Sequence, residues 1–226
     1  MKLYYHPLST TSRPVLQFIA ENRLDVEYQV VDLFAGEHLK DEFEAVNASR
    51  QVPVLEDGDL RLTESSAILK YLGEKIGSGD YPRDLRERAQ VNEMMDWFNT
   101  GLYRDLGYGF VYPQCLPNHR RPDEALQSSA LSWARERARN WLEVLDRRLI
   151  GPEKPYLCGE RITIADYFGA ALLTIGELVH IDFARYRNIE RWLGNVKARP
   201  GWLFANDAFY SHWVAPMKDS ACASLQ

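Results

Sequence analysis

Residues 50–72 read RQVPVLEDGDLRLTESSAILKYL, and this stretch contains three predicted elements in a row. Apolar residues at 53–56 and 60–62 flank the turn sequence Asp57-Gly58-Asp59, which predicts a β-hairpin. From residue 64 to residue 75, apolar residues recur at helical spacing and predict a helix with one buried face. The stretch therefore predicts two antiparallel strands followed directly by a helix.

The residues before this stretch also alternate between strand and helix. Residues 2–5 and 26–32 have the apolar and aromatic composition of strands. Between them we expect a helix from Thr11 or Ser12 to Asn22, and a short helical turn follows at 42–46. The order β-α-β-α-β-β-α implies an α/β domain over residues 1–77, with helices packed on a small mixed sheet.

The composition changes after this domain. Residues 78–86 are short, polar and interrupted by glycine and proline, and we interpret them as a linker. Residues 87–226 show helical periodicity and no convincing strand, so we expect an all-helical domain with a loose tail from about residue 217. The predicted helices of this domain cover residues 87–103, 122–149, 163–179, 188–199 and 202–209.

The bulk composition excludes several classes of function. The 226 residues carry a net charge of −5, whereas nucleic-acid binding needs a dominant basic surface. No apolar run reaches the roughly 18–20 residues of a membrane span, and the first residues lack the features of a signal peptide. The cysteines Cys115, Cys158 and Cys222 are widely spaced, which fits a reducing compartment. We therefore expect a cytoplasmic protein with no nucleic-acid or membrane partner.

Three stretches of the α/β domain contain groups that bind anions or peptides, although each also has a simpler explanation. Ser9-Thr10-Thr11-Ser12 precedes a helix, where hydroxyls either cap the helix or help its N–H groups to hold an anion such as a thiolate. Val52-Pro53 precedes a strand and, if cis, exposes backbone groups that pair with an extended peptide. Glu64-Ser65-Ser66 opens the next helix, where it either caps that helix or binds a carboxylate and an ammonium.

Taken together with the order of elements, these stretches resemble the glutathione transferases, and the resemblance covers essentially the whole chain. Residues 32–72, DLFAGEHLKDEFEAVNASRQVPVLEDGDLRLTESSAILKYL, and residues 156–171, YLCGERITIADYFGAA, are most similar to the serine-type classes theta and delta. The resemblance implies a thioredoxin-like N-terminal domain and an all-helical C-terminal domain. It also implies glutathione as co-substrate without a metal or nucleotide, a homodimer and a bacterial source.

The resemblance assigns roles to individual residues. In these classes the catalytic serine lies four residues before an arginine of the first helix, so Arg13 selects Ser9, with Thr10 as the alternative. Arg13 itself is expected to be an ion-paired structural residue. The expected glutathione-binding residues are Ser9 for the thiolate, Val52 and a cis Pro53 for the cysteinyl unit, Glu64, Ser65 and Ser66 for the γ-glutamyl end, and His38 and Arg50 for the glycine carboxylate.

The resemblance places the electrophile site between the two domains. Its expected lining is Leu8, Tyr103, Tyr108, Phe110, Tyr112, Phe209 and Trp213, although aromatic residues at these spacings serve equally well as core. Gly107 and Gly109 suggest a bend that makes room for a substrate or lets a loop move. Thr163-Ile164-Ala165-Asp166 has the pattern of a helix capping box, so we assign Asp166 to folding and not to catalysis.

The predicted function is therefore a glutathione transferase that conjugates the glutathione thiolate to hydrophobic electrophiles, a role in detoxification. One alternative is a glutathione-dependent dehalogenase, because residues 87–92, ERAQVN, share the general pattern of bacterial dichloromethane dehalogenases. A second alternative is a non-catalytic protein that binds glutathione or another ligand with the same fold. A thiol-disulfide oxidoreductase is less favoured, because no cysteine lies near Ser9.

Overall fold

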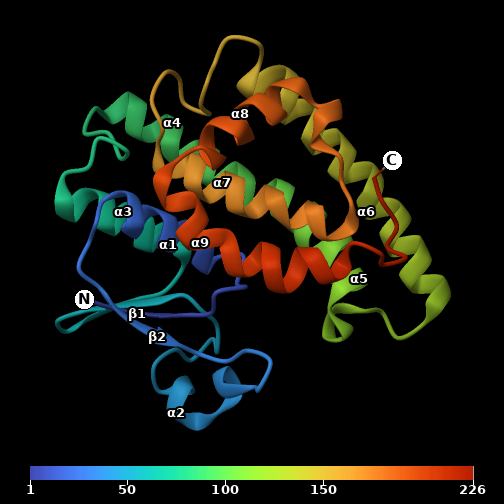
Figure 1. Cartoon of the computed structure of the whole chain (residues 1–226), viewed down its shortest axis with the longest axis horizontal. Helices are drawn as coiled ribbons and strands as arrows, with labels where there is room; N and C mark the ends of the chain where they lie inside the picture. Colours follow the sequence, from blue (N-terminus) through green and yellow to red (C-terminus); the bar gives the residue numbers. More distant parts are fainter. Residues whose placement is uncertain (226) are drawn as a thin grey trace.

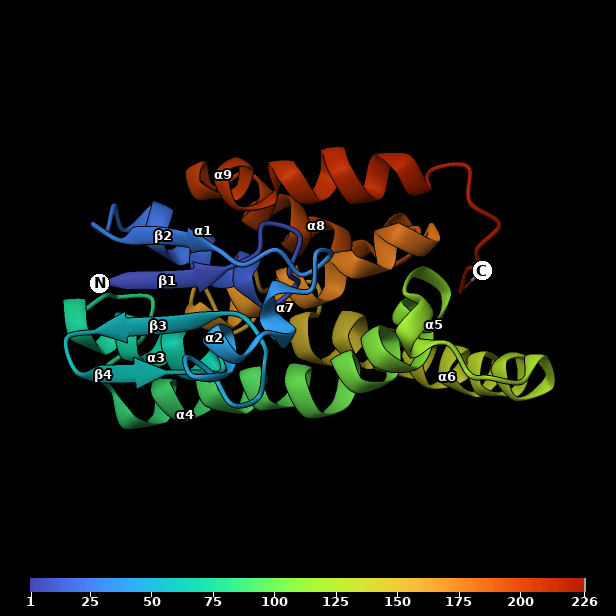
Figure 2. The ribbon, with the colours of Figure 1, turned by 90° about the horizontal axis from the view of Figure 1, so that it is seen from below.

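The computed structural model describes residues 1–225 and contains a four-stranded sheet followed by a helical array. The strands are β1 (Lys2–Tyr5), β2 (Glu27–Val30), β3 (Val54–Asp57) and β4 (Leu60–Leu62). Their order is β2-β1-β3-β4, as Figure 2 shows, with β1 parallel to β2 and antiparallel to β3, and β3 antiparallel to β4. The predicted α/β domain followed by an all-helical domain is confirmed.

Alternation along the strands gives the sheet two different buried faces, because successive side chains point to opposite sides. Leu3 and Leu55 join the main core beneath α1 (Ser12–Glu21) and α3 (Ser65–Ile76). Val54 faces the other way and joins a smaller core with Phe43. Phe43 belongs to α2 (Asp41–Glu44), which follows the 3₁₀ turn η1 (Glu37–Leu39) and covers the sheet face opposite the helical domain (Figure 1).

The first helical stretch of the helical domain is longer than the sequence predicts. The helix predicted at 87–103 begins as α4 (Leu85–Asp96), continues through the π-helical segments η2 (Trp97–Leu102) and η3 (Arg104–Val111), and ends with α5 (Tyr112–Cys115). The helix predicted at 122–149 is α6 (Glu124–Val144), continued by the π-helical segment η5 (Leu145–Ile150). The remaining helical elements are the 3₁₀ turn η4 (Pro117–His119), α7 (Ile164–Thr174), η6 (Ile175–Val179), η7 (Phe183–Arg185), α8 (Arg187–Lys197), α9 (Pro200–Phe209), η8 (Tyr210–Val214) and η9 (Ala215–Met217).

Gly107 and Gly109 both lie within the π-helical segment η3, so the chain stays helical at these positions. A Cβ atom on Gly107 would lie 2.6 Å from the ring of Tyr103, and one on Gly109 would lie 3.1 Å from the Cβ of Ala134. These glycines therefore allow close packing of η3 and do not interrupt the helix.

Helix α1 is the structural link between the two domains, because it packs on α3 and also on α7 and α9. Arg13 of α1 is fully buried, and its guanidinium lies 3.7 Å from the ring centroid of Phe209. It donates to Thr174 Oγ1 (3.2 Å), Asn206 Oδ1 (2.8 Å) and the carbonyl of Ala171 (2.7 Å). These acceptors are neutral and no carboxylate within residues 1–225 pairs with Arg13, so the expected ion pair is wrong.

The predicted capping box at the start of α7 is present. Asp166 is completely buried and accepts hydrogen bonds from the backbone N–H groups of Thr163 (2.7 Å) and Leu157 (2.8 Å). It also accepts from the Thr163 hydroxyl (2.9 Å) and from Trp192 Nε1 (2.8 Å). The carboxylate thus joins the helix start, the preceding loop and α8, which supports a folding role.

The C-terminal segment 218–225 has little regular structure, but it is packed and not loose. The Leu225 side chain is buried against the main core, and the Ala223 N–H donates to Gln114 Oε1 at 2.7 Å. Figures 1 and 2 both show this segment beside α5 and α6. Among the described residues, no helix is long and apolar enough to cross a membrane.

Candidate functional site

The sheet topology gathers three of the predicted stretches at one edge. Val54 at the start of β3 pairs with Tyr4, near the end of β1. Leu62 at the end of β4 pairs with Leu55, so the residues that follow β4 return to the same edge. The segment after β1, Val52-Pro53 before β3, and Glu64-Ser65 after β4 therefore lie at neighbouring positions, as the sequence predicts.

Ser9 lies just before α1, and its half-buried hydroxyl is part of a short hydrogen-bonded chain. Ser9 Oγ accepts from the Ser12 N–H at 3.2 Å and contacts Thr11 Oγ1 at 3.3 Å. Thr11 donates its single hydroxyl hydrogen to the carbonyl of Val52 at 3.1 Å, so Ser9 is the donor in the Ser9–Thr11 pair. Ser9 Oγ therefore satisfies the first N–H group of α1, and its hydroxyl hydrogen can turn to a new acceptor.

Thr10 faces the helical domain and lies in a different environment. Its side chain is 4% exposed, and its Oγ1 accepts from the Tyr112 hydroxyl at 2.8 Å. Tyr112 in turn shares a hydrogen bond of 2.5 Å with the hydroxyl of Tyr103. Because burial raises the pKa of Tyr112 to about 12, this chain stays neutral at physiological pH. The Thr10 hydroxyl is thus already engaged by a buried tyrosine.

The backbone of the candidate site departs from ordinary geometry at several points. The Val52-Pro53 peptide bond is cis. Glu64, which precedes α3, has φ +63° and ψ 112°, and Arg50 has φ +53°. Positive φ values are costly for residues other than glycine and are concentrated at functional sites. Ser65 follows at the first position of α3 and is buried, while Glu64 is exposed and Ser66 half-buried.

The two basic residues expected at the glycine end have different partners. His38 of η1 is half-buried, and its Nδ1 atom is buried without a hydrogen-bond partner within residues 1–225. Arg50 forms an ion pair with Glu44 of α2, so its guanidinium already has an acidic partner. Nearby, His6 Nδ1 accepts from the Leu8 N–H at 3.2 Å and fixes the loop that leads to Ser9. Burial lowers the pKa of His6, which keeps its ring neutral.

The residues expected at the electrophile site divide into exposed and buried groups. Tyr108 is 46% exposed and packs edge-on against Tyr103 and Tyr112, with ring centroids 5.1 and 5.2 Å apart. Leu8 and Trp213 are half-buried. Phe110 and Phe209 have no exposed surface and lie in the core, while Tyr103 and Tyr112 are buried in the hydroxyl chain to Thr10. Among these residues, the open surface comes mainly from Tyr108, Leu8 and Trp213.

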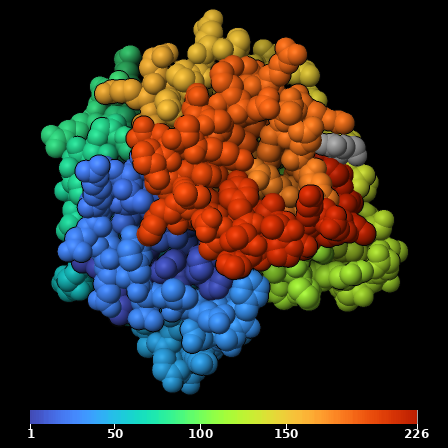
Figure 3. Space-filling view, viewed as in Figure 1, coloured from blue at the N-terminus to red at the C-terminus, as the bar shows by residue number. Residues whose placement is uncertain are grey.

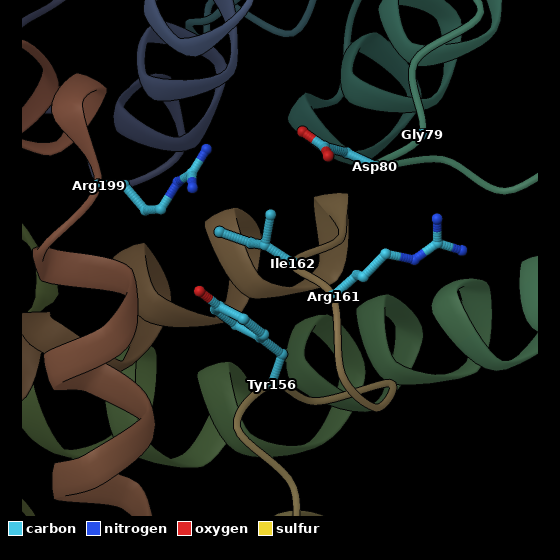
Figure 4. Close-up of a pocket in the computed structure, with 6 residues that line it drawn as sticks. All are labelled: Gly79, Asp80, Tyr156, Arg161, Ile162 and Arg199. Carbon is cyan, nitrogen blue, oxygen red and sulfur yellow. The ribbon is translucent and has the colours of Figure 1, made fainter.

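Two surface cavities lie away from these residues. One, of about 310 Å³, is lined by Gly79, Asp80, Tyr156, Arg161, Ile162 and Arg199 (Figure 4). Arg199 pairs with Glu21 at the end of α1, whereas Ser9 precedes its start, so the cavity is separated from Ser9 by the length of a ten-residue helix. The other, of about 210 Å³, is lined by residues of α6, of the region 181–186 and by Leu225. Within residues 1–225, no three His, Cys, Asp or Glu side chains gather as metal ligands would.

Comparison with known proteins gives a consistent picture. Residues 1–74 match the glutathione S-transferase N-terminal domain, and residues 116–200 match the glutathione S-transferase C-terminal domain. The chain belongs to the glutathione S-transferase family. It is 36% identical over 182 residues to glutathione S-transferase theta-1 of Bos taurus, which covers 80% of this chain and 72% of the relative. These matches support glutathione transferase activity, with glutathione as the substrate that the family uses.

Solved structures of the family have the same architecture. A delta-class glutathione transferase from Nilaparvata lugens superposes with a TM-score of 0.79 at 32% identity, over 96% of this chain and 98% of that chain. The apo form of human glutathione-S-transferase T1-1 gives a TM-score of 0.79 at 31% identity, over 92% of this chain and 88% of that chain. The predicted similarity to the theta and delta classes is therefore confirmed.

Two functional features of the site are not evident in the sequence. Thr11 connects Ser9 to the cis-proline segment, although the sequence only shows that it is one of four adjacent hydroxyl residues. The chain from Tyr103 through Tyr112 to Thr10 joins residues about a hundred positions apart. The Ser-Thr-Thr-Ser pattern indicates that hydroxyl groups cap the helix or bind a ligand at this turn. Only the structure shows that Ser9 and Thr11 lie toward Val52 while Thr10 faces the helical domain.

Proposed function

We propose that this transferase holds glutathione as a thiolate with the Ser9 hydroxyl and conjugates it to hydrophobic electrophiles. The observation that supports the assignment most is the hydrogen-bond pattern at Ser9, which leaves one hydroxyl hydrogen in a half-buried position at the N-terminus of α1. Thr10 is only 4% exposed and its Oγ1 faces Tyr112 in the interior, so this burial makes Thr10 the weaker candidate.

The interactions available at this site are strong enough to lower the pKa of the glutathione thiol. A free thiol has a pKa of about 8.5, and a reduction of about two units requires roughly 2.7 kcal/mol of preference for the thiolate. A hydrogen bond to a charged group contributes about 1.5–3 kcal/mol. A helix N-terminus adds about 0.3–1 kcal/mol, and up to about 2 kcal/mol where the anion is partly buried. Ser9 and α1 together therefore suffice without a cationic partner for the sulfur.

The rest of the tripeptide follows from the same proposal. The backbone of Val52, held by Thr11 ahead of the cis Pro53, pairs with the cysteinyl unit. Glu64 binds the γ-glutamyl ammonium, while Ser65 and Ser66 with the first N–H groups of α3 bind its carboxylate. The unpartnered His38 Nδ1 supports a role at the glycine carboxylate, where Arg50 assists if it leaves Glu44.

The electrophile binds beside this site, between the two domains. Tyr108, Leu8 and Trp213 supply an accessible apolar surface there. Steady-state assays with glutathione and a panel of aryl halides, epoxides and alkyl halides test the proposal. Conjugate formation is the expected result, and glutathione binding without any conjugate would favour a binding protein. Halide release from dihalomethanes would assign a dehalogenase.

We also propose that the enzyme is cytoplasmic and forms a homodimer between the α/β domain of one protomer and the helical domain of the other. Dimerisation is typical of the family that the chain belongs to. Light scattering at micromolar concentration should give a mass of twice 26.1 kDa. A mass equal to one chain would contradict the dimer.

A further inference from the structure

Two of the three free cysteines lie beside each other in the fold. Cys115 is the last residue of α5, and Cys222 belongs to the C-terminal segment 218–225. Both are half-buried and pack against the main core. Cys158 lies in the loop before α7, where it interacts with Thr163 and Asp166. Only the first two cysteines are therefore considered as a pair.

The segment that carries Cys222 is held against α5 by hydrogen bonds on the neighbouring residues. The Ala223 N–H donates to Gln114 Oε1 at 2.7 Å, and Gln114 Nε2 donates to the carbonyl of Ala223 at 3.3 Å. One side-chain amide thus binds both backbone groups of Ala223, next to Cys222, while Gln114 is itself next to Cys115. Figure 3 shows the dark red segment lying against the green surface of α5 and α6.

Further contacts fix the segment on both sides of Cys222. His180 Nε2 lies 3.2 Å from both the carbonyl and the hydroxyl oxygen of Ser220, and the Ser220 hydroxyl donates to Cys222 Sγ at 3.3 Å. Beyond Cys222, Arg139 Nε donates to the carbonyl of Leu225 at 2.5 Å. The Cys222 side chain is therefore held in place and does not sample a free chain end.

The two thiols are near enough to influence each other's ionisation. Burial raises the pKa of the Cys115 thiol to about 12, and the neighbouring Cys222 also contributes to the increase. A disulfide requires Cα atoms about 4.4–6.8 Å apart with Cβ atoms directed at each other, and the Gln114–Ala223 hydrogen bonds bring the segments of Cys115 and Cys222 side by side, as such a link needs.

We propose that Cys115 and Cys222 form a redox-modification site, in which a small disulfide such as glutathione disulfide oxidises them to an intrachain disulfide that ties the C-terminal segment to α5. The proposal does not depend on the role of Ser9. Glutathione disulfide is the oxidised form of glutathione, the substrate that the family uses, so the thiol and disulfide forms of glutathione occur together.

The chemistry proceeds by two thiol–disulfide exchanges. The Cys222 thiolate attacks one sulfur of glutathione disulfide, whose S–S bond breaks, and one glutathione thiolate leaves. Cys115 then loses its proton to solvent and attacks the Cys222 sulfur, and the second glutathione thiolate leaves. Two protein thiols are oxidised to one disulfide, and one glutathione disulfide is reduced to two glutathione molecules. Cys222 attacks first, because burial raises the pKa of Cys115 and so leaves a smaller fraction of it as the thiolate.

The test treats the reduced full-length protein with glutathione disulfide and measures the intact mass before and after reduction. We expect the mass to fall by two hydrogens. A non-reducing tryptic map should then join the peptide of residues 105–120 to that of residues 219–226, and a reductant should separate them. As a second readout, trypsin cleavage after the exposed Lys218 should release the C-terminal peptide from the reduced native protein but not from the oxidised protein.

Matched variants distinguish the pair from general thiol reactivity. Cys158→Ser should form the disulfide like the wild type, whereas Cys115→Ser and Cys222→Ser should not lose two hydrogens. A stable glutathione adduct on the wild-type protein, a disulfide that includes Cys158, or an unchanged mass would each overturn the proposal.

Discussion

Replacement of Ser9 by alanine gives the most direct test of the proposed thiolate site. In the ligand-free structure the Ser9 hydroxyl donates to Thr11 Oγ1 over 3.3 Å, because the hydrogen of Thr11 is given to the carbonyl of Val52. When a thiolate binds, the Ser9 hydrogen turns to the sulfur, while Ser9 Oγ still accepts from the Ser12 N–H. One neutral hydrogen bond is thereby exchanged for one to a charged atom.

The size of the effect follows from this exchange. A neutral hydrogen bond contributes about 0.5–1.5 kcal/mol and one to a charged group about 1.5–3 kcal/mol, so the net gain between the middles of these ranges is about 1.3 kcal/mol. That free energy corresponds to roughly one pKa unit of the bound glutathione thiol. Ser9→Ala should therefore raise this pKa by about one unit and reduce the rate about tenfold at a pH below the wild-type value.

Ultraviolet difference absorbance of bound glutathione across pH measures the thiolate directly. Thr10→Ala is the matched control, because Thr10 is the neighbouring hydroxyl residue and its side chain is buried beside Tyr112. If Ser9→Ala binds glutathione and ionises it at the wild-type pH, the proposed role of Ser9 is refuted. A shift in Thr10→Ala alone would assign the role to the neighbouring residue. Binding without ionisation in the wild type would indicate a binding protein.

Three further predictions concern stability. Burial lowers the pKa of His6 from 6.5, so the unfolded chain binds a proton at higher pH than the folded protein does. The free energy of unfolding should therefore fall as the pH drops below 6.5. Urea midpoints at neutral and mildly acidic pH measure this dependence, and His6→Asn should weaken it. Asp166→Ala leaves four buried donors without their acceptor and should lower the free energy of unfolding, measured in urea, by about 3–5 kcal/mol. The kcat per folded molecule should stay unchanged, and a selective loss of kcat would argue for a catalytic role instead. Tyr112→Phe breaks the hydroxyl chain to Thr10 and should lower the free energy of unfolding by about 1–3 kcal/mol. A changed pKa of the bound glutathione thiol would contradict a purely structural role of Tyr112.

Features encoded by short-range patterns are predicted well from the sequence. The strands, the Asp57-Gly58-Asp59 turn and the capping box of Thr163 and Asp166 depend on residues a few positions apart. The sequence therefore places them within a few residues of their observed bounds. The site segments were assigned from the resemblance, and the observed strand order brings the ends of β1 and β4 and the start of β3 to one edge.

Features that depend on distant partners are predicted less well. Arg13 was expected to have a carboxylate partner, but its acceptors come from α7 and α9, about 160–190 positions away, and are neutral. Phe110 and Tyr108 are two positions apart in η3, yet one is buried and the other is 46% exposed. Helical spacing shows that two residues differ in orientation, but it does not show which orientation faces the core.

The position of α1 between the two domains has a consequence for synthesis on the ribosome. The α/β domain emerges first, but the face of α1 that carries Arg13 is buried only when α7 and α9 are available. Between residue 77 and the end of α9 at Phe209 lie more than a hundred residues. At roughly 5–20 residues per second their translation takes on the order of ten seconds. Throughout that time the nascent N-terminal domain exposes the face of α1 that is buried in the folded protein. Its folding is therefore completed only after the last helices leave the exit tunnel.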